Sequence, residues 1–144
     1  MSIRDNLRIA MYDRLLSRVP DLYGSAILIG LENHTFKEPK DDPHMYAYFV
    51  EIASKRASIG TTNRFNRHTG FFCVDVLVPE KSGTAQLSKM IDAVVDSFED
   101  DHFLLDDGSY VTSLTPQVVG KGKQDGKYLK TVMVKYLMDS GVAR

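Results

Sequence analysis

Histidine is the side chain that most readily binds metals or moves protons near neutral pH. The four histidines are far apart in the sequence: His34, His44, His68 and His102. No two have the HxH, HxxxH or HExxH spacing that brings two imidazoles together on one element. The nearest cluster of potential ligands, Asp41, Asp42 and His44 around Pro43, is typical of a turn. We therefore expect no metal and no cofactor.

A nucleophile is the second kind of chemistry to consider. Cys73 lies near His68 and Asp75 in the sequence, and a thiolate beside a base can attack a substrate. Strand alternation, however, puts Cys73 and Asp75 on one face of a predicted strand, where a free cysteine is more often buried and inert. The glycines of residues 119–127, VGKGKQDGK, do not form a GxxxxGK[ST] loop between a strand and a helix. The sequence predicts no catalytic residue and no enzyme.

Positive charge is concentrated in residues 55–70, KRASIGTTNRFNRHTG, which contain no acid. The cations are Lys55, Arg56, Arg64 and Arg67. The Gly, Ser, Thr and Asn content predicts a loop. Such a loop either contacts phosphates or an acidic protein surface or is simply solvated. Phe65 is its one aromatic residue, far fewer than a single-strand nucleic-acid platform displays.

Overall charge limits the classes of partner. The chain has 144 residues, and its 18 Lys and Arg against 19 Asp and Glu give a net charge of −1, which argues against global attraction to nucleic acid. An acidic region follows the second predicted helix: Glu99, Asp100, Asp101, Asp106 and Asp107. Apolar runs shorter than ten residues and a charged N-terminus predict neither a membrane span nor a secretory signal. The single cysteine excludes an intramolecular disulfide and agrees with the cytosol.

Two segments have the periodicity of amphipathic helices. The first is predicted from about Ser2 to Arg18, ending before Pro20 because the residue before a proline disfavours the α region. Its core-facing residues are Ile3, Leu7, Ala10, Met11 and Leu15. A second apolar set is a candidate partner surface: Ile9, Tyr12, Leu16 and Val19. The second helix begins at Ser82 or Thr84 and carries one apolar stripe: Leu87, Met90, Ile91, Val94, Val95 and Phe98.

Strand patterns occupy most of the remaining chain. Strands are predicted at Ala26–Leu31, Met45–Ser54, Phe71–Val78, Ser109–Val119 and Tyr128–Met138. The polar residues 32–43 and 120–127 are predicted loops, so a β-hairpin ends the chain. The order of elements predicts an α+β fold in a single domain over residues 1–144. It has two amphipathic helices packed on one face of a mostly antiparallel sheet of four or five strands.

Several of these segments, in this order, resemble a known family. They are the N-x-x-F-K-E-P run at Asn33 to Pro39, the aromatic strand at Tyr46 to Ile52 and the basic segment ending at Gly70. VDVLVPEKSGTAQ follows at Val74 to Gln86, before the helix that leads to Phe98. The pattern is similar to that of the tail-terminator proteins of long-tailed bacteriophages, also called minor tail or tail-completion proteins.

The resemblance implies an architectural protein of the virion. Such a subunit assembles as a ring, thought of as a hexamer, at the head-proximal end of the tail tube, after assembly in the host cytoplasm. The ring stops tube elongation and provides a surface for the head-tail connector protein, and genome DNA passes through its lumen without sequence-specific binding. Its partners would be itself, the tail tube protein and the connector, with no membrane.

The charged segments have a defined place in this interpretation. A ring uses heterologous interfaces, in which one patch complements a different patch on the neighbour. We expect the basic residues 55–67 and the acidic residues 99–107 to meet across subunits, or one of them to line the lumen. The alternative is a small monomeric nucleic-acid-binding α+β module that uses the basic loop 55–68. A small-molecule enzyme ranks third, because no titratable pair has a useful spacing.

Overall fold

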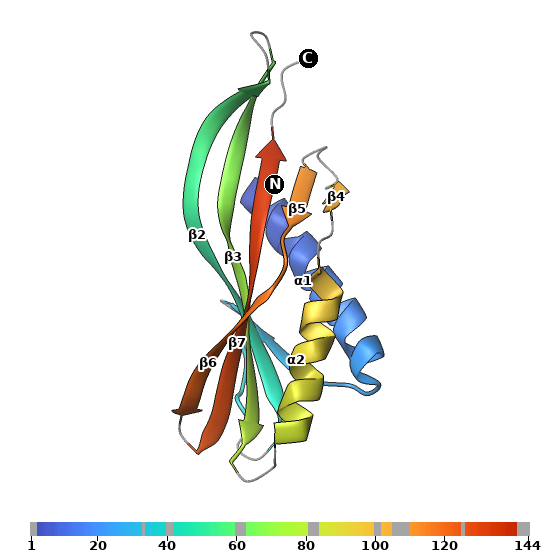
Figure 1. The fold of residues 1–144 in the computed structure, drawn as a ribbon. Coiled ribbons are helices and arrows are strands. Elements are labelled where there is room, and N and C mark those ends of the chain that lie inside the picture. The colour runs from blue at the N-terminus through green and yellow to red at the C-terminus, as the bar shows by residue number, and fades with distance from the viewer. Residues whose placement is uncertain are drawn as a thin grey trace.

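The computed structural model describes residues 3–32, 34–39, 42–59, 63–80, 84–99, 102–104, 110–124 and 126–140. Its helices are α1 (Ile3–Tyr23) and α2 (Thr84–Phe98). Its strands are β1 (Leu28–Leu31), β2 (His44–Ile59), β3 (Asn63–Pro79), β4 (His102–Leu104), β5 (Tyr110–Ser113), β6 (Gln117–Gln124) and β7 (Lys127–Ser140). Both helices lie on one side of a strongly twisted sheet (Figure 1). The predicted α+β class is therefore confirmed.

The sheet is larger than predicted and it is mixed. It has seven strands in the order β1-β2-β3-β7-β5-β4, and β6 also pairs with β7. β1 runs parallel to β2, whereas the other pairs are antiparallel. The expectation of four or five strands was wrong because the predicted strand at Ser109–Val119 is two strands, β5 and β6, with Pro116 between them. β4 had no sequence signal of its own, since three residues are too few for a periodicity.

The core lies between the sheet and the helices. Alternate residues of β3, Phe72, Val74 and Val76, are fully buried there, as the strand pattern predicted. The apolar stripe of α2 is also confirmed, with Met90 and Phe98 fully buried. Cys73 is buried in the middle of β3, on the other face of the sheet.

The first helix extends past the predicted end. α1 continues through Pro20 to Tyr23, and Gly24 follows it with a φ of 92°. The amide of Gly24 donates a hydrogen bond to the carbonyl of Pro20 at 2.9 Å. A proline near the end of a helix removes one hydrogen bond, but the left-handed glycine is the stronger stop signal here.

The basic segment is not a loop, and this is the main correction to the sequence-based fold. Residues 55–59 continue β2 and residues 63–70 begin β3, so that the two strands extend the sheet as a long arm, in which residues 66–70 also pair with β7 (Figure 1). The register continues to the Ile59–Asn63 pair. The polar composition predicted a loop, but pairing with a partner strand overrides weak local β-propensity. A register shift between Glu51 and Ala53 marks a β-bulge at the root of the arm.

The C-terminal hairpin is confirmed, with a much shorter connection than expected. β6 runs to Gln124 and β7 begins at Lys127, so most of the predicted loop at 120–127 is strand. Gly126 in the turn has a φ of 77°. A glycine at positive φ in a two-residue connection is typical of a tight hairpin turn.

Candidate functional site

The arm brings the predicted basic positions together in the backbone register. Lys55 pairs with Arg67, and Arg64 pairs with Ser58. The side chains of Lys55, Arg56 and Arg64 lie outside the described residues. The backbone register therefore places these basic positions on one arm, which makes the arm a candidate interaction element.

Arg67 has a partner within its own chain. Its Nε and one terminal nitrogen donate to the two carboxylate oxygens of Asp139 at 2.8 and 3.0 Å. This bidentate ion pair joins β3 to β7, where Arg67 and Asp139 are direct cross-strand neighbours. The hydrogen bond that Arg67 donates to Asp139 raises the pKa of Arg67. Sequence patterns do not point to Asp139, because alternation assigns faces but does not give the register between distant strands.

The predicted acidic counter-surface is described only at one position. Glu99 follows the end of α2 and is exposed. The remaining acidic residues, Asp100, Asp101, Asp106 and Asp107, lie outside the described residues. The pairing of the basic and acidic segments across subunits therefore stays a prediction.

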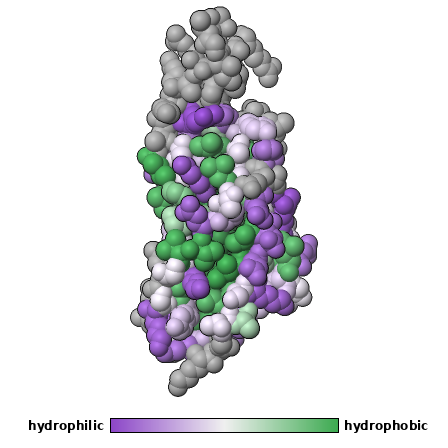
Figure 2. Space-filling model, viewed as in Figure 1, coloured by the Kyte–Doolittle hydropathy of each residue, from purple (hydrophilic) through white to green (hydrophobic). Residues whose placement is uncertain are grey.

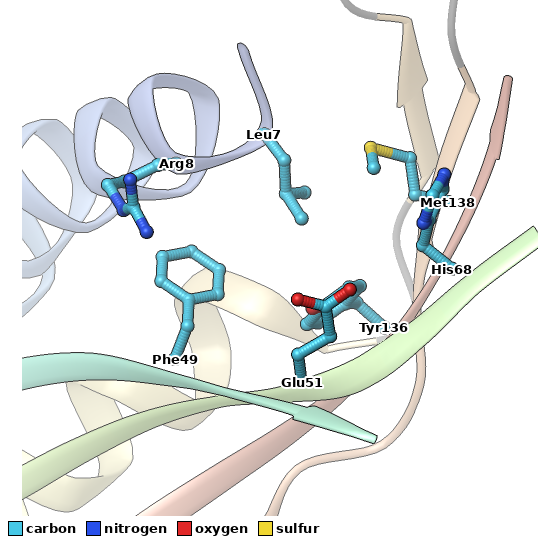
Figure 3. Close-up of a pocket in the computed structure, with 7 residues that line it drawn as sticks. All are labelled: Leu7, Arg8, Phe49, Glu51, His68, Tyr136 and Met138. Carbon is cyan, nitrogen blue, oxygen red and sulfur yellow. The ribbon is translucent and has the colours of Figure 1, made fainter. Parts of the chain in front are cut away.

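A small hollow lies where the N-terminal half of α1 meets the root of the arm. Figure 3 shows Leu7 and Arg8 reaching from α1 toward Phe49, with Glu51 and Tyr136 on the sheet below them. His68 and Met138 complete the lining. The Arg8 guanidinium lies 5.8 Å from the centre of the Phe49 ring. The hollow has about 40 Å³, far below the roughly 300–1,000 Å³ of small-molecule sites.

A larger groove opens between the C-terminal end of α1, β1 and the start of α2. It has a volume of about 320 Å³ and is lined by Tyr23, Ser25, Ala26, Ile27, Leu28, Asp42, Pro43, Gln86 and Met90. Asp42 is the one ionisable acid in this lining, so the groove offers no pair of carboxylates for acid-base work. Within the described ranges, no three His, Cys, Asp or Glu residues lie close enough to hold a metal ion.

Residues 34–39, which we call the strap, lie on the face of the sheet away from the helices. They cover its lower half, which consists of β1 and the sheet end near the starts of β2 and β7. The Phe36 ring packs there on Gly30, where an added Cβ would lie 2.6 Å from a ring carbon. The buried Nζ of Lys127 donates to Oε1 of Glu38 at 2.8 Å and to the carbonyl of Pro39 at 2.7 Å. The ammonium of Lys127 fixes the strap to the sheet.

His44 contributes a titratable group beneath the strap. It is almost fully buried, and its Nε2 lies 3.4 Å from Oε1 of Glu38. Burial lowers the pKa of His44, and the hydrogen bond from Lys127 lowers the pKa of Glu38. His44 therefore has the environment of a neutral structural histidine.

The upper half of this sheet face, which we call the open face, has neither helix nor strap over it. Val50 on β2 is 43% exposed there, and Ile52 at the adjacent bulge is 55% exposed. Beside Val50 in the register lies the half-buried Phe71, and beside Phe71 lies Lys135 of β7. The boundary with the strap half is polar, since the hydroxyls of Tyr48 and Thr131 donate to Asp75 at 3.2 and 2.6 Å.

Exposed apolar residues also occur on two other elements. On α1, the predicted partner set divides: Tyr12 and Val19 are buried, whereas Ile9 and Leu16 are 46% and 43% exposed. A second group lies at the β5–β6 edge: Leu114, Val118 and Val119. Figure 2 shows hydrophobic residues gathered in the middle of the molecule, where the strands cross beside α2. Contiguous exposed apolar patches can mark protein interaction surfaces.

No helix in the described part of the chain has the length and apolar character needed to cross a membrane. Among the described residues, the functional candidates are surfaces: the arm, the open face, the exposed side of α1 and the β5–β6 edge.

Two solved structures are similar to this chain over nearly its whole length. A solved structure that carries no functional name matches with a TM-score of 0.73 at 19% identity, covering 98% of each chain. A chain from the virion of a native gene transfer agent particle matches with a TM-score of 0.65 at 15% identity, covering 96% of this chain and 98% of that chain. At these identities the two structures establish the shared fold.

The sequence itself supplies the family. No curated protein matches it. The family model described as phage tail terminator protein matches residues 6–136, which include both helices and most of the sheet. The chain therefore belongs to the phage tail terminator family, and it is a structural protein of the virion tail.

Proposed function

We propose that this protein caps the phage tail tube as a ring, most simply a hexamer, and so ends tube elongation. The exposed side of the ring then provides the attachment surface for the head-tail connector protein. Genome DNA passes through the lumen without sequence-specific binding. The protein acts at the head-proximal end of the tail after assembly in the host cytoplasm.

The observation that carries this proposal is the presence of exposed apolar residues on different sides of one subunit. Ile9 and Leu16 project from α1, whereas Val50 lies on the sheet face away from both helices. A ring needs two different patches on each subunit, because every interface joins unlike surfaces. Membership of the tail terminator family supports the choice of the tail tube as the surface that this ring covers.

The arm is the element that we propose for contact with a neighbouring subunit or for the lumen wall. Its basic positions are Lys55, Arg56, Arg64 and Arg67. The acidic positions that would face them across an interface are Glu99, Asp100, Asp101, Asp106 and Asp107. Reversal at Arg64 is the cleaner test, since reversal at Arg67 also breaks the in-chain pair with Asp139. Arg64→Glu is expected to weaken the ring if the arm contacts an acidic neighbour.

The direct test of the function uses purified tail tube protein that polymerises in vitro. Tubes are grown with and without the present protein, and tube lengths are measured by electron microscopy. We expect shorter tubes that carry a ring at one end and that no longer grow when tube protein is added. Tubes of unchanged length without bound protein would overturn the proposal.

The nucleic-acid-binding alternative makes a different prediction in the same samples. It requires a monomer in light scattering and salt-dependent binding to DNA, because phosphate contacts release counterions. The Arg67–Asp139 pair speaks against it, since one of the four basic positions is already neutralised within the chain. A monomer that binds DNA and ignores tail tubes would favour this alternative.

A further inference from the structure

The open face carries one exposed cation inside an apolar surround. Lys135 is exposed, and it pairs with Phe71 in the register. Met133 and Leu137, two residues before and after it on β7, are half-buried on the same face. Val50 lies on the far side of Phe71 and is 43% exposed. The face therefore presents a lysine bordered by apolar side chains, and no helix or strap in the described part of the chain covers it.

The exposed side of α1 has the opposite arrangement. Ile9, Asp13 and Leu16 follow each other at helical spacing on one side, and we call them the outer ridge. Ile9 and Leu16 are 46% and 43% exposed, and Asp13 between them is exposed as well. The ridge therefore presents a carboxylate bordered by apolar side chains.

In both arrangements the charge lies between two apolar side chains, at separations of the same order. Along the helix, Ile9 and Leu16 lie about 6 Å and about 4.5 Å from Asp13, at a rise of about 1.5 Å per residue. Along β7, Met133 and Leu137 each lie about 7 Å from Lys135, at a rise of about 3.4 Å per residue. In the described part of the chain, neither Asp13 nor Lys135 forms an ion pair.

We propose that the outer ridge of one copy packs on the open face of the next copy, with Asp13 against Lys135. The occupant of the open face is thus a second copy of this chain. The contact would cover the face of the sheet that α1 and α2 leave bare. It rests on the proposed function, because it names the subunit interface of the proposed ring.

The contact has the symmetry that a ring requires. The ridge and the open face lie on different layers of the subunit, so a copy that receives a ridge on its sheet still offers its own ridge to the next copy (Figure 1). Repetition of such an unlike contact gives a closed ring or an open helix, whereas a like-to-like contact stops at two copies. The apolar residues supply attraction and the charge pair sets the orientation.

The experiment is a charge swap, followed by light scattering at fixed protein and salt concentration. Asp13→Lys and Lys135→Asp are each expected to reduce the mass from that of the ring to that of the 16.2 kDa chain. The double variant D13K/K135D is expected to recover the ring, since the pair is restored with reversed sign. Both positions are exposed, so the variants are expected to fold. Unchanged circular dichroism and an unchanged thermal midpoint check this.

A matched control separates this contact from a general effect of charge. Asp96→Lys introduces the same change at an exposed position of α2, and it is expected to leave the ring intact. If the single variants keep the ring mass, or if the double variant fails to recover it, the interface is wrong while the ring function stands. If the unmodified protein forms rings neither in solution nor on tail tubes, the ring function fails, and the interface fails with it.

Discussion

The two faces of the sheet are built from the same strands but differ in what covers them. On the helix face, Phe72, Val74 and Val76 have no exposed surface, because α1 and α2 pack over them. On the other face, Val50 of the neighbouring strand β2 is 43% exposed. Folding needs the first face, since burial of each large apolar side chain stabilises by about 1.5–3 kcal/mol. The second face keeps apolar residues that the isolated chain does not bury, and this difference separates the surfaces for folding from those for assembly.

The largest expected effect comes from truncation on the helix face. Phe72→Ala leaves a cavity among the rings of Phe49, Tyr12 and Phe98, and we expect it to lower the free energy of unfolding by about 3–5 kcal/mol. Phe71→Ala, its neighbour on the open face, should cost clearly less. Urea denaturation of both variants measures the difference. Equal losses would mean that the two faces contribute equally to folding.

Sequence patterns predicted the helix face of the sheet better than they predicted the arm, for a physical reason. Alternation at Phe71–Val78 and the stripe of α2 give the buried residues directly, because burial on one side produces a period. The arm has no such period, since polar residues on both sides of residues 55–59 and 63–70 carry no burial signal. Its strands are held by pairing with each other, and a single sequence does not show which segments pair.

The strap and the ion pairs were hidden for a related reason. Lys127, Glu38 and His44 are far apart in the sequence and meet only because the strap crosses the sheet. Asp139 pairs with Arg67 by the same kind of long-range register. In the sequence these residues are charges in a polar context, and the partner of each charge cannot be predicted until the topology is known.

The second prediction concerns the strap, which covers the part of this sheet face that lies next to the open face. Glu38→Ala removes one of two acceptors from the buried Nζ of Lys127. We expect the free energy of unfolding to fall by about 1–2 kcal/mol, a value that already allows for solvent screening of the half-exposed Glu38. Lys127→Met removes the buried charge itself, so it should cost less. Thermal denaturation of both variants tests the order. A larger loss for Lys127→Met would contradict it.

A smaller effect follows from pH. The pKa of His44 is lowered by burial, so the unfolded chain binds protons more readily than the folded chain as the pH falls below about 6.5. The pKa of Glu38 is also lowered, and its contribution is lost at still lower pH. The thermal midpoint should therefore fall with acidification. A His44→Gln variant should show a flatter profile between about pH 7 and pH 5, and an equally steep profile would exclude His44 as the cause.

The smallest effect on folding, and the sharpest contrast with Phe72, is expected at Val50. Val50→Ser replaces a side chain that is 43% exposed on an arm-root strand, so the free energy of unfolding should change by no more than about 0.5 kcal/mol. The same substitution removes apolar surface from the open face and is expected to weaken ring formation measured by light scattering. A surface that binds a second copy requires residues of this kind, which contribute to assembly and hardly to folding. If Val50→Ser instead unfolds the chain without affecting the ring at equal folded concentration, the upper half of this face belongs to the folding core after all, and the contrast between the two faces is lost.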